Sequence, residues 1–210
     1  DFPDYEFSDG LKLPGDIHPS LFGYQKTGVQ WLAELYKQNV GVIIGDEMGL
    51  GKTVQLIAFI AALHYSKKLR RPVIVVAPAT LLRQWVSEFH RWWPPLRVAI
   101  LHSSGSGMMN PKFEDDYDLD HYQPLATKSE KAARKIVNGV VKSGHVLVTT
   151  YTGLQTYAET LLPVQWDYAV LDEGHKIRNP NAEITVTCKE LNTPNRVILS
   201  GTPVQNNLTE

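Results

Sequence analysis

Short apolar runs alternate with amphipathic stretches from residue 18 onward. The runs have the length and unbroken hydrophobicity of buried strands, and they occupy 40–44, 73–77, 98–101, 145–149, 168–171 and 196–199. Between most of them, apolar residues recur at helical spacing, which predicts helices over 21–35, 54–65, 81–92, 130–140 and 182–191. Parallel strands need crossover helices and bury both of their faces. The pattern therefore predicts an α/β fold with a mostly parallel sheet that helices cover on both faces.

Two segments stand outside this alternation. Residues 1–17 are rich in acidic residues and are expected to form an N-terminal lead-in, whereas residues 18–210 are expected to form one α/β lobe. Residues 103–127 are rich in Gly, Ser and Asp, so we expect a mobile or disordered surface insertion there, with no chemistry assigned to it. Thr127 and Glu130 have the spacing of a capping box, which predicts that the following helix begins near them.

A glycine-rich segment follows the first strand and opens the next helix. Glycines let main-chain N–H groups close on phosphates, and the helix dipole favours the bound anion. The segment 45–53 is therefore predicted to bind the phosphates of magnesium ATP; the alternative is a glycine-rich turn before an ordinary helix. Lys52 is expected to reach the β and γ phosphates, and the Thr53 hydroxyl to hold Mg²⁺. The usual pattern has Gly where Asp46 stands here. The predicted nucleotide-binding residues of the loop are Asp46, Gly49, Gly51, Lys52 and Thr53.

An acidic pair follows the strand at 168–171. Ligands collect at the carboxyl ends of parallel strands, so Asp172 and Glu173 are expected at the same edge as the phosphate loop. Asp172 is predicted to hold Mg²⁺, and Glu173 to polarise the water that attacks the γ phosphate. Acidic residues after a strand are also common turn formers, so the pair is interpreted as a catalytic element only because a predicted phosphate loop lies in the same sheet. The predicted catalytic residues are Lys52, Asp172 and Glu173, and the predicted metal ligands are Thr53 and Asp172.

Two further strand ends carry small polar residues followed by helix starts. Main-chain N–H groups at such positions can hold a phosphate backbone without reading bases. Each tripeptide taken alone is equally typical of a helix N-cap. The candidate DNA-binding residues are Pro78, Ala79, Thr80, Thr149, Thr150 and Tyr151.

The charge distribution is compatible with a polyanionic partner, although the net charge is −1. Acidic residues are concentrated in 1–17 and 112–120, and the rest of the chain holds 19 basic and 12 acidic residues. Basic runs at 67–71 and 128–135 could contact phosphates, and a solvated helix end explains either run equally well.

Composition argues against several other classes of protein. No apolar run approaches the roughly 20 residues of a membrane span, and the first residues do not resemble a secretion signal. Cys188 is the single cysteine, so an internal disulfide is excluded and a reducing compartment is expected. The histidines are scattered, and their spacing does not suggest a metal-ligand set. A soluble protein without a membrane partner is therefore expected.

Five motifs taken together resemble the first lobe of Swi/Snf-type superfamily 2 ATPases. They are Tyr24-Gln25 and the segments 46–53, 77–80, 172–175 and 200–207, and the resemblance spans residues 18–210. Within that family, the segments 88–95, 97–102 and 172–181 are most similar to the Cockayne syndrome group B family, including its fungal members.

The resemblance carries its own expectations. It implies a RecA-like lobe that uses ATP and Mg²⁺, in which Gln25 contacts adenine. His175, Ser200, Gly201 and Thr202 would couple the nucleotide state to DNA. It also implies a nuclear, DNA-dependent ATPase that translocates on double-stranded DNA without separating the strands. The implied setting is transcription-coupled DNA repair and chromatin remodelling, with RNA polymerase II as a partner.

A second lobe is expected beyond Glu210, because such motors bind ATP between two lobes and take arginine fingers from the second one. The isolated first lobe would then bind nucleotide weakly and hydrolyse it poorly. Two other classes remain open. An RNA helicase shares the lobe, the loop and the acidic pair, and a docking module that no longer cycles could retain the same surface.

Overall fold

A computed structural model of the chain describes residues 2–7, 10–38, 41–45, 51–102, 107–109, 130–143, 145–173 and 183–200. Within this part, the main sheet has seven strands in the order β3-β9-β8-β4-β7-β5-β6. They are β3 (Val42–Gly45), β4 (Val73–Val76), β5 (Val98–His102), β6 (Gly107–Met109), β7 (Val146–Thr149), β8 (Tyr168–Asp172) and β9 (Arg196–Ser200). Of these described strands, β6 pairs antiparallel and the other neighbours pair parallel. The predicted mostly parallel sheet is confirmed.

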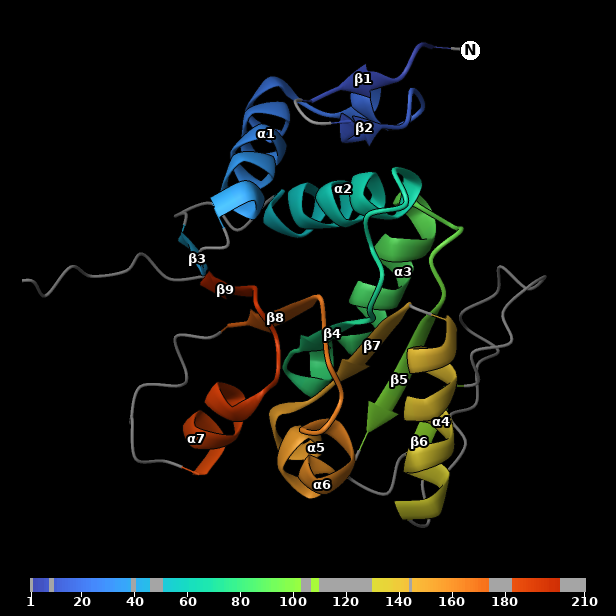
Figure 1. The fold of residues 1–210 in the computed structure, drawn as a ribbon, viewed down its shortest axis with the longest axis vertical. Coiled ribbons are helices and arrows are strands. Elements are labelled where there is room, and N and C mark those ends of the chain that lie inside the picture. The colour runs from blue at the N-terminus through green and yellow to red at the C-terminus, as the bar shows by residue number, and fades with distance from the viewer. Residues whose placement is uncertain are drawn as a thin grey trace, which may run out of the picture.

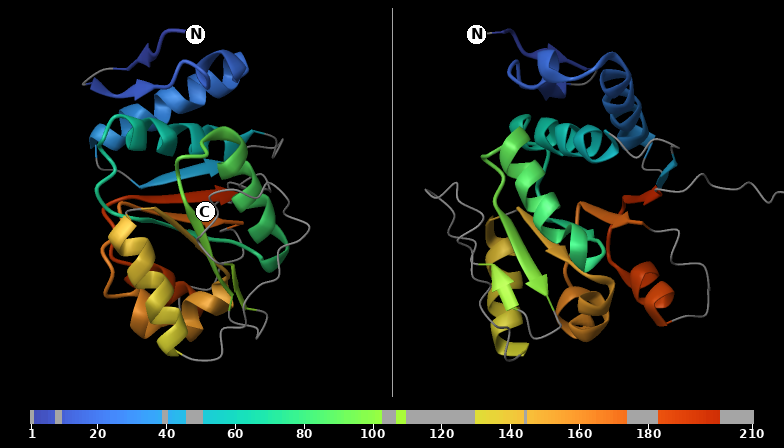
Figure 2. Two further views of the ribbon diagram at one scale, coloured as in Figure 1. Left: turned by 90° about the vertical axis from the view of Figure 1, so that its right-hand side faces the viewer. Right: turned by 180° about the vertical axis from the view of Figure 1, so that it is seen from behind.

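Helices lie on both faces of this sheet, as predicted (Figure 1). One face packs against α2 and α3, with α1 on the outer side of α2, and the other face packs against α4 to α7 (Figure 2). The helices are α1 (Gly23–Gln38), α2 (Lys52–Tyr65), α3 (Leu82–Trp92), α4 (Glu130–Ser143), α5 (Tyr151–Thr156), α6 (Ala158–Leu161) and α7 (Glu183–Glu190). Short 3-10 turns at His18–Ser20 and Ala79–Leu81 precede α1 and α3.

The strands are continuously apolar because both faces of the sheet are buried. In β4, Val73 and Val75 belong to the core under α2 and α3, whereas Ile74 and Val76 belong to the core under α4 to α7. All four side chains are fully buried. The alternation of side chains along one strand thus fills two separate cores.

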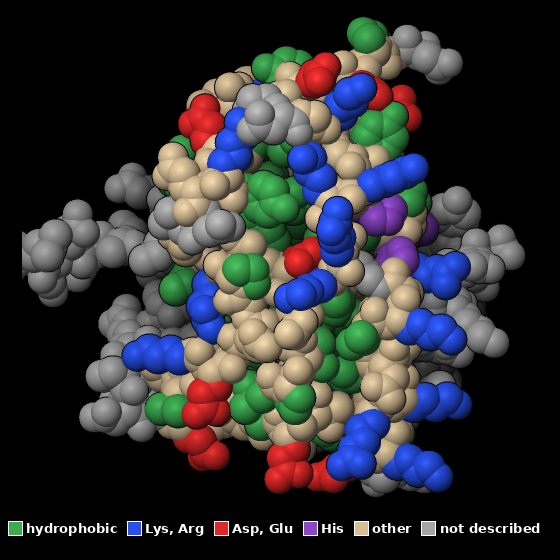
Figure 3. All heavy atoms as spheres, in the orientation of Figure 1, with side chains coloured by type: hydrophobic (Ala, Val, Ile, Leu, Met, Phe, Trp, Pro, Cys, Tyr) green, Lys and Arg blue, Asp and Glu red, His purple; other side chains and the backbone are tan. Residues whose placement is uncertain are grey.

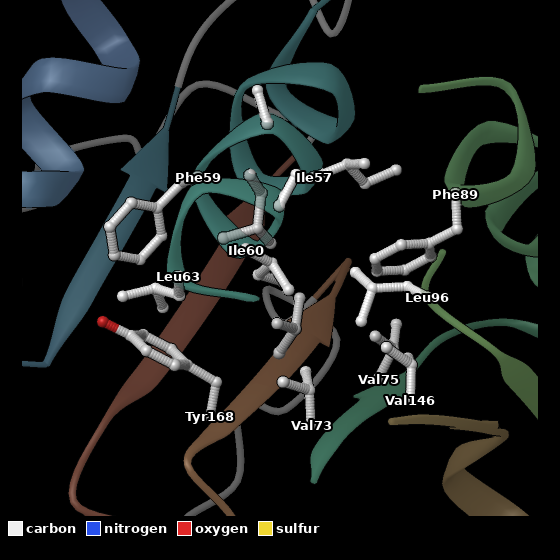
Figure 4. Close-up of a cluster of buried hydrophobic side chains, with 14 of the residues drawn as sticks. Ile57, Phe59, Ile60, Leu63, Val73, Val75, Phe89, Leu96, Val146 and Tyr168 are labelled. Atoms are coloured by element: carbon white, nitrogen blue, oxygen red, sulfur yellow. The ribbon is translucent and has the colours of Figure 1, made fainter. Parts of the chain in front are cut away.

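Helix α2 is buried along most of its length, which its sequence anticipates because it is apolar on nearly every side. Its side chains face the sheet, as Figure 4 shows for Ile57, Ile60 and Leu63. Phe59 lies edge-on to Tyr168 of β8, with ring centroids 5.7 Å apart. The helix that begins at Lys52 is therefore anchored rigidly to the sheet.

The predicted buried stripes hold only in part. The apolar spacing over 21–35 places Tyr24 and either Trp31 or Leu32 on the buried face of the first helix. In α1 the buried face is formed by Gln25, Val29, Leu32 and Ala33, while Tyr24 is 54% and Trp31 44% exposed. Tyr65, placed on the buried stripe of the next helix, is 42% exposed. The reason is that α1 packs on α2 and the N-terminal residues, which select a different face from the one that large apolar side chains suggest.

Several elements were not predicted at all. Strands β1 (Tyr5–Glu6) and β2 (Lys12–Leu13) form a two-stranded antiparallel sheet within the acidic lead-in. Leu13 is fully buried and belongs to the core that contains α2. Strand β6 lies inside the segment expected to be an insertion and pairs with β5. The short helix α6 was also missed, whereas α5 was expected only as a helix start after the strand at 145–149. The rest of 103–127, and Thr127, lie outside the described residues.

Two histidines meet at the amino-terminal edge of the sheet. His64 Nδ1 accepts a hydrogen bond from Trp93 Nε1 at 2.9 Å, and His145 Nδ1 accepts one from the Arg97 amide at 2.7 Å. The two imidazole rings are 5.8 Å apart. Burial lowers the pKa of His145 to about 4, and the neighbouring His64 and the positive charge of Arg97 act in the same direction. Both acceptor nitrogens must stay unprotonated for these hydrogen bonds to exist.

This arrangement predicts a specific pH dependence of stability. Because the folded-state pKa of His145 lies below its ordinary value, its contribution is complete above about pH 6.5 and is lost as the pH falls towards 4. His145→Asn keeps an acceptor for the Arg97 amide but does not titrate. Urea unfolding between pH 7 and 4 should give a flatter dependence for this variant than for the wild type. The matched change at exposed His90, His90→Asn, should leave the slope unchanged; equal slopes for all three proteins would contradict the assignment.

Candidate functional site

The predicted phosphate loop follows β3, and the acidic pair lies at the end of β8, two positions away in the sheet. Strand β9 lies between β3 and β8, and all three run parallel. Their register pairs Gly45 with Ser200, and Asp172 with Leu199. The carboxyl ends of β3, β8 and β9 therefore meet at one edge, where the chain also enters α2.

The start of α2 has the backbone expected of a phosphate-binding turn. Gly51 precedes the helix with φ +101°, a conformation that favours glycine. Lys52 is the first residue of the helix and is only 5% exposed, and Thr53 follows at partial exposure. The preceding loop residues Asp46 and Gly49 lie outside the described residues.

Gln25 closes the space beside Gly51. Its side chain is 5% exposed, and its Oε1 accepts a hydrogen bond from the Phe22 amide at 2.9 Å. A Cβ on Gly51 would lie 2.9 Å from Gln25 Nε2 and 3.0 Å from the Tyr24 hydroxyl oxygen. The structure thus brings Gln25 to the start of α2, with its amide held in one orientation.

A cavity of about 980 Å³ opens beside these residues. Phe22, Tyr24 and Gln25 line it before and within α1, and Gly51 and Val54 line it at the start of α2. The end of α3 contributes a mixed wall that includes Arg91 and Trp92. Aromatic rings with a few fixed polar groups are typical of small-molecule sites, and the volume is sufficient for a nucleoside.

Asp172 is held by hydrogen bonds at every oxygen atom. Its Oδ2 accepts from Trp85 Nε1 at 2.8 Å, its Oδ1 from the Glu173 amide at 2.9 Å, and its main-chain carbonyl from the Tyr151 hydroxyl at 2.6 Å. Burial raises the pKa of Asp172, while the Trp85 hydrogen bond and the charge of Lys52 act in the opposite direction. Lys52 and Asp172 are thus close enough to interact electrostatically, although 120 positions separate them.

The donor set suits Mg²⁺. Asp172 and Thr53 offer oxygen ligands, which this ion prefers, and Mg²⁺ usually takes one or two protein ligands together with phosphates and water. Among the described residues there is no cluster of three or more His, Cys, Asp or Glu that could hold a metal alone. An ion at this edge would therefore be shared between the protein and a phosphorylated ligand.

The two candidate DNA segments end adjacent parallel strands. Pro78, Ala79 and Thr80 follow β4 and are partly or fully exposed. Thr149 and Thr150 end β7 but are nearly buried, and Thr150 caps α5 by accepting from the Gly153 amide at 2.8 Å. Any phosphate contact at this second segment would therefore come from its main chain.

The remaining predicted residues are less defined. Ser200 ends β9, and only its backbone is described. His175, Gly201 and Thr202 lie outside the described residues.

The structure adds contacts that sequence analysis did not predict. Periodicity indicates that Trp85 is buried, but its hydrogen bond to Asp172 spans 87 residues and has no local signature. The inward hydroxyl of Tyr151 was missed for the same reason, because the residue was interpreted as a DNA contact.

The two basic runs lie at different ends of the sheet. Residues 67–71 connect α2 to β4 at the amino ends of the strands, where the Arg70 and Arg71 amides donate to Asp167. Lys131, Arg134 and Lys135 lie exposed in the first half of α4. Because α4 ends beside the start of β7, its first turns lie towards the carboxyl ends of the strands. Figure 3 shows Lys and Arg side chains gathered along the side of the molecule that carries α4.

A RecA-like lobe with a phosphate-binding turn and an acidic strand end defines a class of ATPase lobes. A profile of the SNF2-related domain matches residues 24–210, so the chain belongs to this family. It is similar to a solved structure described as the Sulfolobus solfataricus SWI2/SNF2 ATPase core in complex with dsDNA, with a TM-score of 0.64 and 29% identity. That match covers 88% of this chain and 32% of the other. The predicted family and fold are confirmed.

Within the SNF2 family, the chain is similar to several DNA repair proteins. The chain is 55% identical to DNA repair and recombination protein RAD26 of Saccharomyces cerevisiae. It is 50% identical to DNA excision repair protein CSB of Oryza sativa and 46% identical to DNA excision repair protein ERCC-6 of Homo sapiens. Each match covers 99% of this chain, but only 21%, 18% and 13% of the respective relative. The predicted resemblance to the Cockayne syndrome group B family is thereby confirmed.

Not one of the described helices combines the length and the apolar character needed to cross a bilayer.

The contacts of Gly51 predict a strong effect of a single methyl group. Gly51→Ala would place a side chain at φ +101° against Gln25 and Tyr24, so we expect it to lower the free energy of unfolding by about 1–3 kcal/mol. Gly139→Ala is the matched control, because this glycine lies exposed within α4 with nothing near its Cβ. That variant should be stabilised by about 0.5–1 kcal/mol. Urea unfolding measures both; effects of the same sign would contradict the geometry.

Proposed function

We propose that this chain is the first lobe of an ATP-dependent motor that translocates on double-stranded DNA. The observation that carries the proposal is the convergence of Lys52 and Asp172 at one edge of the sheet: Lys52 begins the helix that follows β3, and Asp172 ends β8, with only β9 between these strands. A buried cation and a partly buried carboxylate at one edge match a metal-bound triphosphate, which presents both signs of charge.

The proposed roles follow from the chemistry of each group. Lys52 and the first amides of α2 bind the β and γ phosphates, and Thr53 with Asp172 holds Mg²⁺. When bound, Mg²⁺ supplies positive charge that offsets the phosphate oxygens. Gln25 contacts adenine in the adjoining cavity, and the aromatic rings of Phe22 and Tyr24 offer apolar surface to the base. Asp46 and Gly49 complete the phosphate loop.

Glu173 is proposed to orient and polarise the attacking water. Its backbone has φ +52°, which is uncommon for a non-glycine residue, and its amide is committed to Asp172 Oδ1. Such strained conformations cluster at functional sites because the surrounding structure must hold them. The same hydrogen bond therefore restrains the backbone of Glu173 and the carboxylate that is proposed to bind the metal.

DNA contact is proposed for 78–80 and 149–151, whose strands end at the same edge. Support comes from the solved relative, which is described as being in complex with dsDNA. His175 and the segment 200–202 are proposed to couple the nucleotide state to DNA.

The names of the relatives support a role in nuclear DNA repair, since three of them are DNA repair or excision repair proteins. We extend this to transcription-coupled repair and chromatin remodelling with RNA polymerase II.

A second lobe with arginine fingers is proposed as part of the same protein, because the chain spans 32% of the solved relative. Residues 1–210 alone should then turn over ATP far more slowly than the whole protein; equal turnover would contradict this.

Two substitutions in the full-length protein test the proposed roles. Lys52→Ala should weaken nucleotide binding, because a buried charge facing the phosphates is lost. Glu173→Gln should keep binding and lower the hydrolysis rate by about 10²- to 10⁴-fold, because the base is lost while the shape is kept. Labelled-nucleotide binding and phosphate release separate the two effects. Lys135→Ala and Glu159→Gln, both exposed, serve as matched controls. Normal hydrolysis by Glu173→Gln would remove its role, and normal binding by Lys52→Ala would remove the proposed function.

One comparison of ATPase rates distinguishes the proposed motor from an RNA helicase lobe and from a docking module that no longer hydrolyses ATP. ATPase rates of the full-length protein should be measured with duplex DNA, single-stranded DNA and RNA at one salt concentration, because phosphate contacts weaken with salt. A duplex-DNA preference supports the motor. An RNA preference with strand separation indicates a helicase, and no turnover with any of them indicates a docking module.

A further inference from the structure

Two aromatic residues donate hydrogen bonds to Asp172, one from each face of the sheet. Trp85 belongs to α3 and is buried in the core under α2 and α3, whereas Tyr151 begins α5 and packs against the core under α4 to α7. The indole Nε1 of Trp85 donates to Asp172 Oδ2 at 2.8 Å. The hydroxyl of Tyr151 donates to the Asp172 main-chain carbonyl at 2.6 Å. Strand β8 thus ends between two fixed donors.

The first contact fixes the plane of the carboxylate. Trp85 occupies one acceptor site on Oδ2, and the Glu173 amide occupies one on Oδ1. With both oxygens held, the group cannot rotate without breaking a hydrogen bond, and each oxygen keeps one further acceptor site. Trp85 is 2% exposed, so its indole has little freedom to follow a moving carboxylate.

The second contact fixes the backbone that carries the carboxylate. Tyr151 reaches from the end of β7 to the end of β8, past the end of β4 that lies between them. Its bond to the carbonyl therefore ties the tips of two strands that do not pair with each other. Asp172 is consequently constrained at its side chain from one face and at its main chain from the other.

Both aromatic residues are connected to the candidate DNA segments. The segment 78–80 leads through the turn Ala79–Leu81 into α3, and Trp85 lies in the first half of that helix. Tyr151 directly follows Thr149 and Thr150, and Thr150 caps α5. A displacement of either segment would be transmitted to Asp172 through one short, buried path.

We propose that Trp85 and Tyr151 are positioning residues that hold Asp172 ready for Mg²⁺ and link it to the two candidate DNA segments. This inference rests on the proposed function and assigns it two residues that touch neither nucleotide nor reacting atoms. Residues that orient a metal ligand commonly change metal affinity by about 10- to 100-fold when replaced.

The first experiment separates nucleotide binding from the magnesium-dependent part of that binding. In the full-length protein, the affinity for fluorescently labelled ADP is measured in EDTA and over a series of Mg²⁺ concentrations. Trp85→Phe keeps an aromatic ring but removes the donor. We expect its affinity in EDTA to change by less than about twofold, and the Mg²⁺ concentration at half effect to rise about tenfold.

Trp166→Phe is the matched control for this variant. Trp166 is fully buried in the other core, and its Nε1 also donates a hydrogen bond, to the Leu161 carbonyl at 3.2 Å. Its replacement should leave the Mg²⁺ series unchanged. A shift of equal size in Trp166→Phe would indicate a general packing effect and overturn the proposal.

The second experiment tests the other face and the link to DNA. Tyr151→Phe removes one oxygen atom and should raise the half-effect Mg²⁺ concentration about three- to tenfold. It should also reduce the ratio of DNA-stimulated to basal ATPase activity. Duplex affinity should stay the same, because the contact proposed for 149–151 comes from the main chain and the Tyr151 hydroxyl is bonded to Asp172. Tyr168→Phe, which alters another buried tyrosine of the same strand as Asp172, should change neither quantity.

The outcomes are decisive in each direction. If Trp85→Phe does not fold, Tyr151→Phe decides alone. A wild-type Mg²⁺ series in Tyr151→Phe, or a loss of duplex affinity without any change in that series, would overturn the proposal. Lys52→Ala distinguishes a failure of the proposed ATPase function from a failure of the positioning role proposed for Trp85 and Tyr151. If it binds labelled ADP normally, the proposed function has failed; if it loses binding while Trp85→Phe and Tyr151→Phe behave as wild type, only this inference has failed.

Discussion

The burial of a parallel sheet on both faces is the constraint on which the rest of the structure depends. All four residues of β4 are inaccessible to solvent, and α2 fills the space above them with an almost entirely apolar surface. Polar side chains have no place in these layers, because unpaired burial costs several kcal/mol. They are displaced to the carboxyl edge, where Gly45, Asp172 and Ser200 end neighbouring strands. Packing therefore determines where chemistry can occur.

At that edge, charged groups are poorly solvated and must be compensated locally. Burial raises the pKa of Asp172, and the carboxylate is retained through hydrogen bonds from Trp85 and Glu173 and through the charge of Lys52. Lys52 is itself almost buried. Removing one member of such a group leaves an uncompensated charge, which is more harmful than the loss of a surface pair. The charges of Lys52 and Asp172 and the hydrogen bonds to Asp172 therefore depend on one another. The space beside Gly51 adjoins these groups, and Gln25 closes one side of it.

The sequence was sufficient to predict the parallel strands, the longer helices and the residues that carry charge at the edge. Each of these leaves a local signal, either periodicity or a glycine-rich turn beside a strand. The hairpin of β1 and β2 leaves none, because strands of two residues are too short to show alternation. The exposure of Tyr24 and Trp31 depends on which elements pack against α1. The hydrogen bonds of Trp85 and Tyr151 to Asp172 join residues that are far apart in the sequence. Tertiary contacts of this kind cannot be derived from spacing alone.

The chemical nature of the two donors to Asp172 suits the proposed link between this carboxylate and DNA. An indole N–H is a donor in every protonation state that the protein reaches, and burial together with nearby negative charge raises the pKa of the Tyr151 hydroxyl further above its ordinary value. Neither donor is therefore lost by titration near neutral pH, as a histidine donor could be. The orientation of Asp172 then depends on where α3 and the start of α5 lie. Both follow strands that end at the exposed edge, so in the proposed motor the displacement of these elements, and not titration, is the signal that reaches this carboxylate.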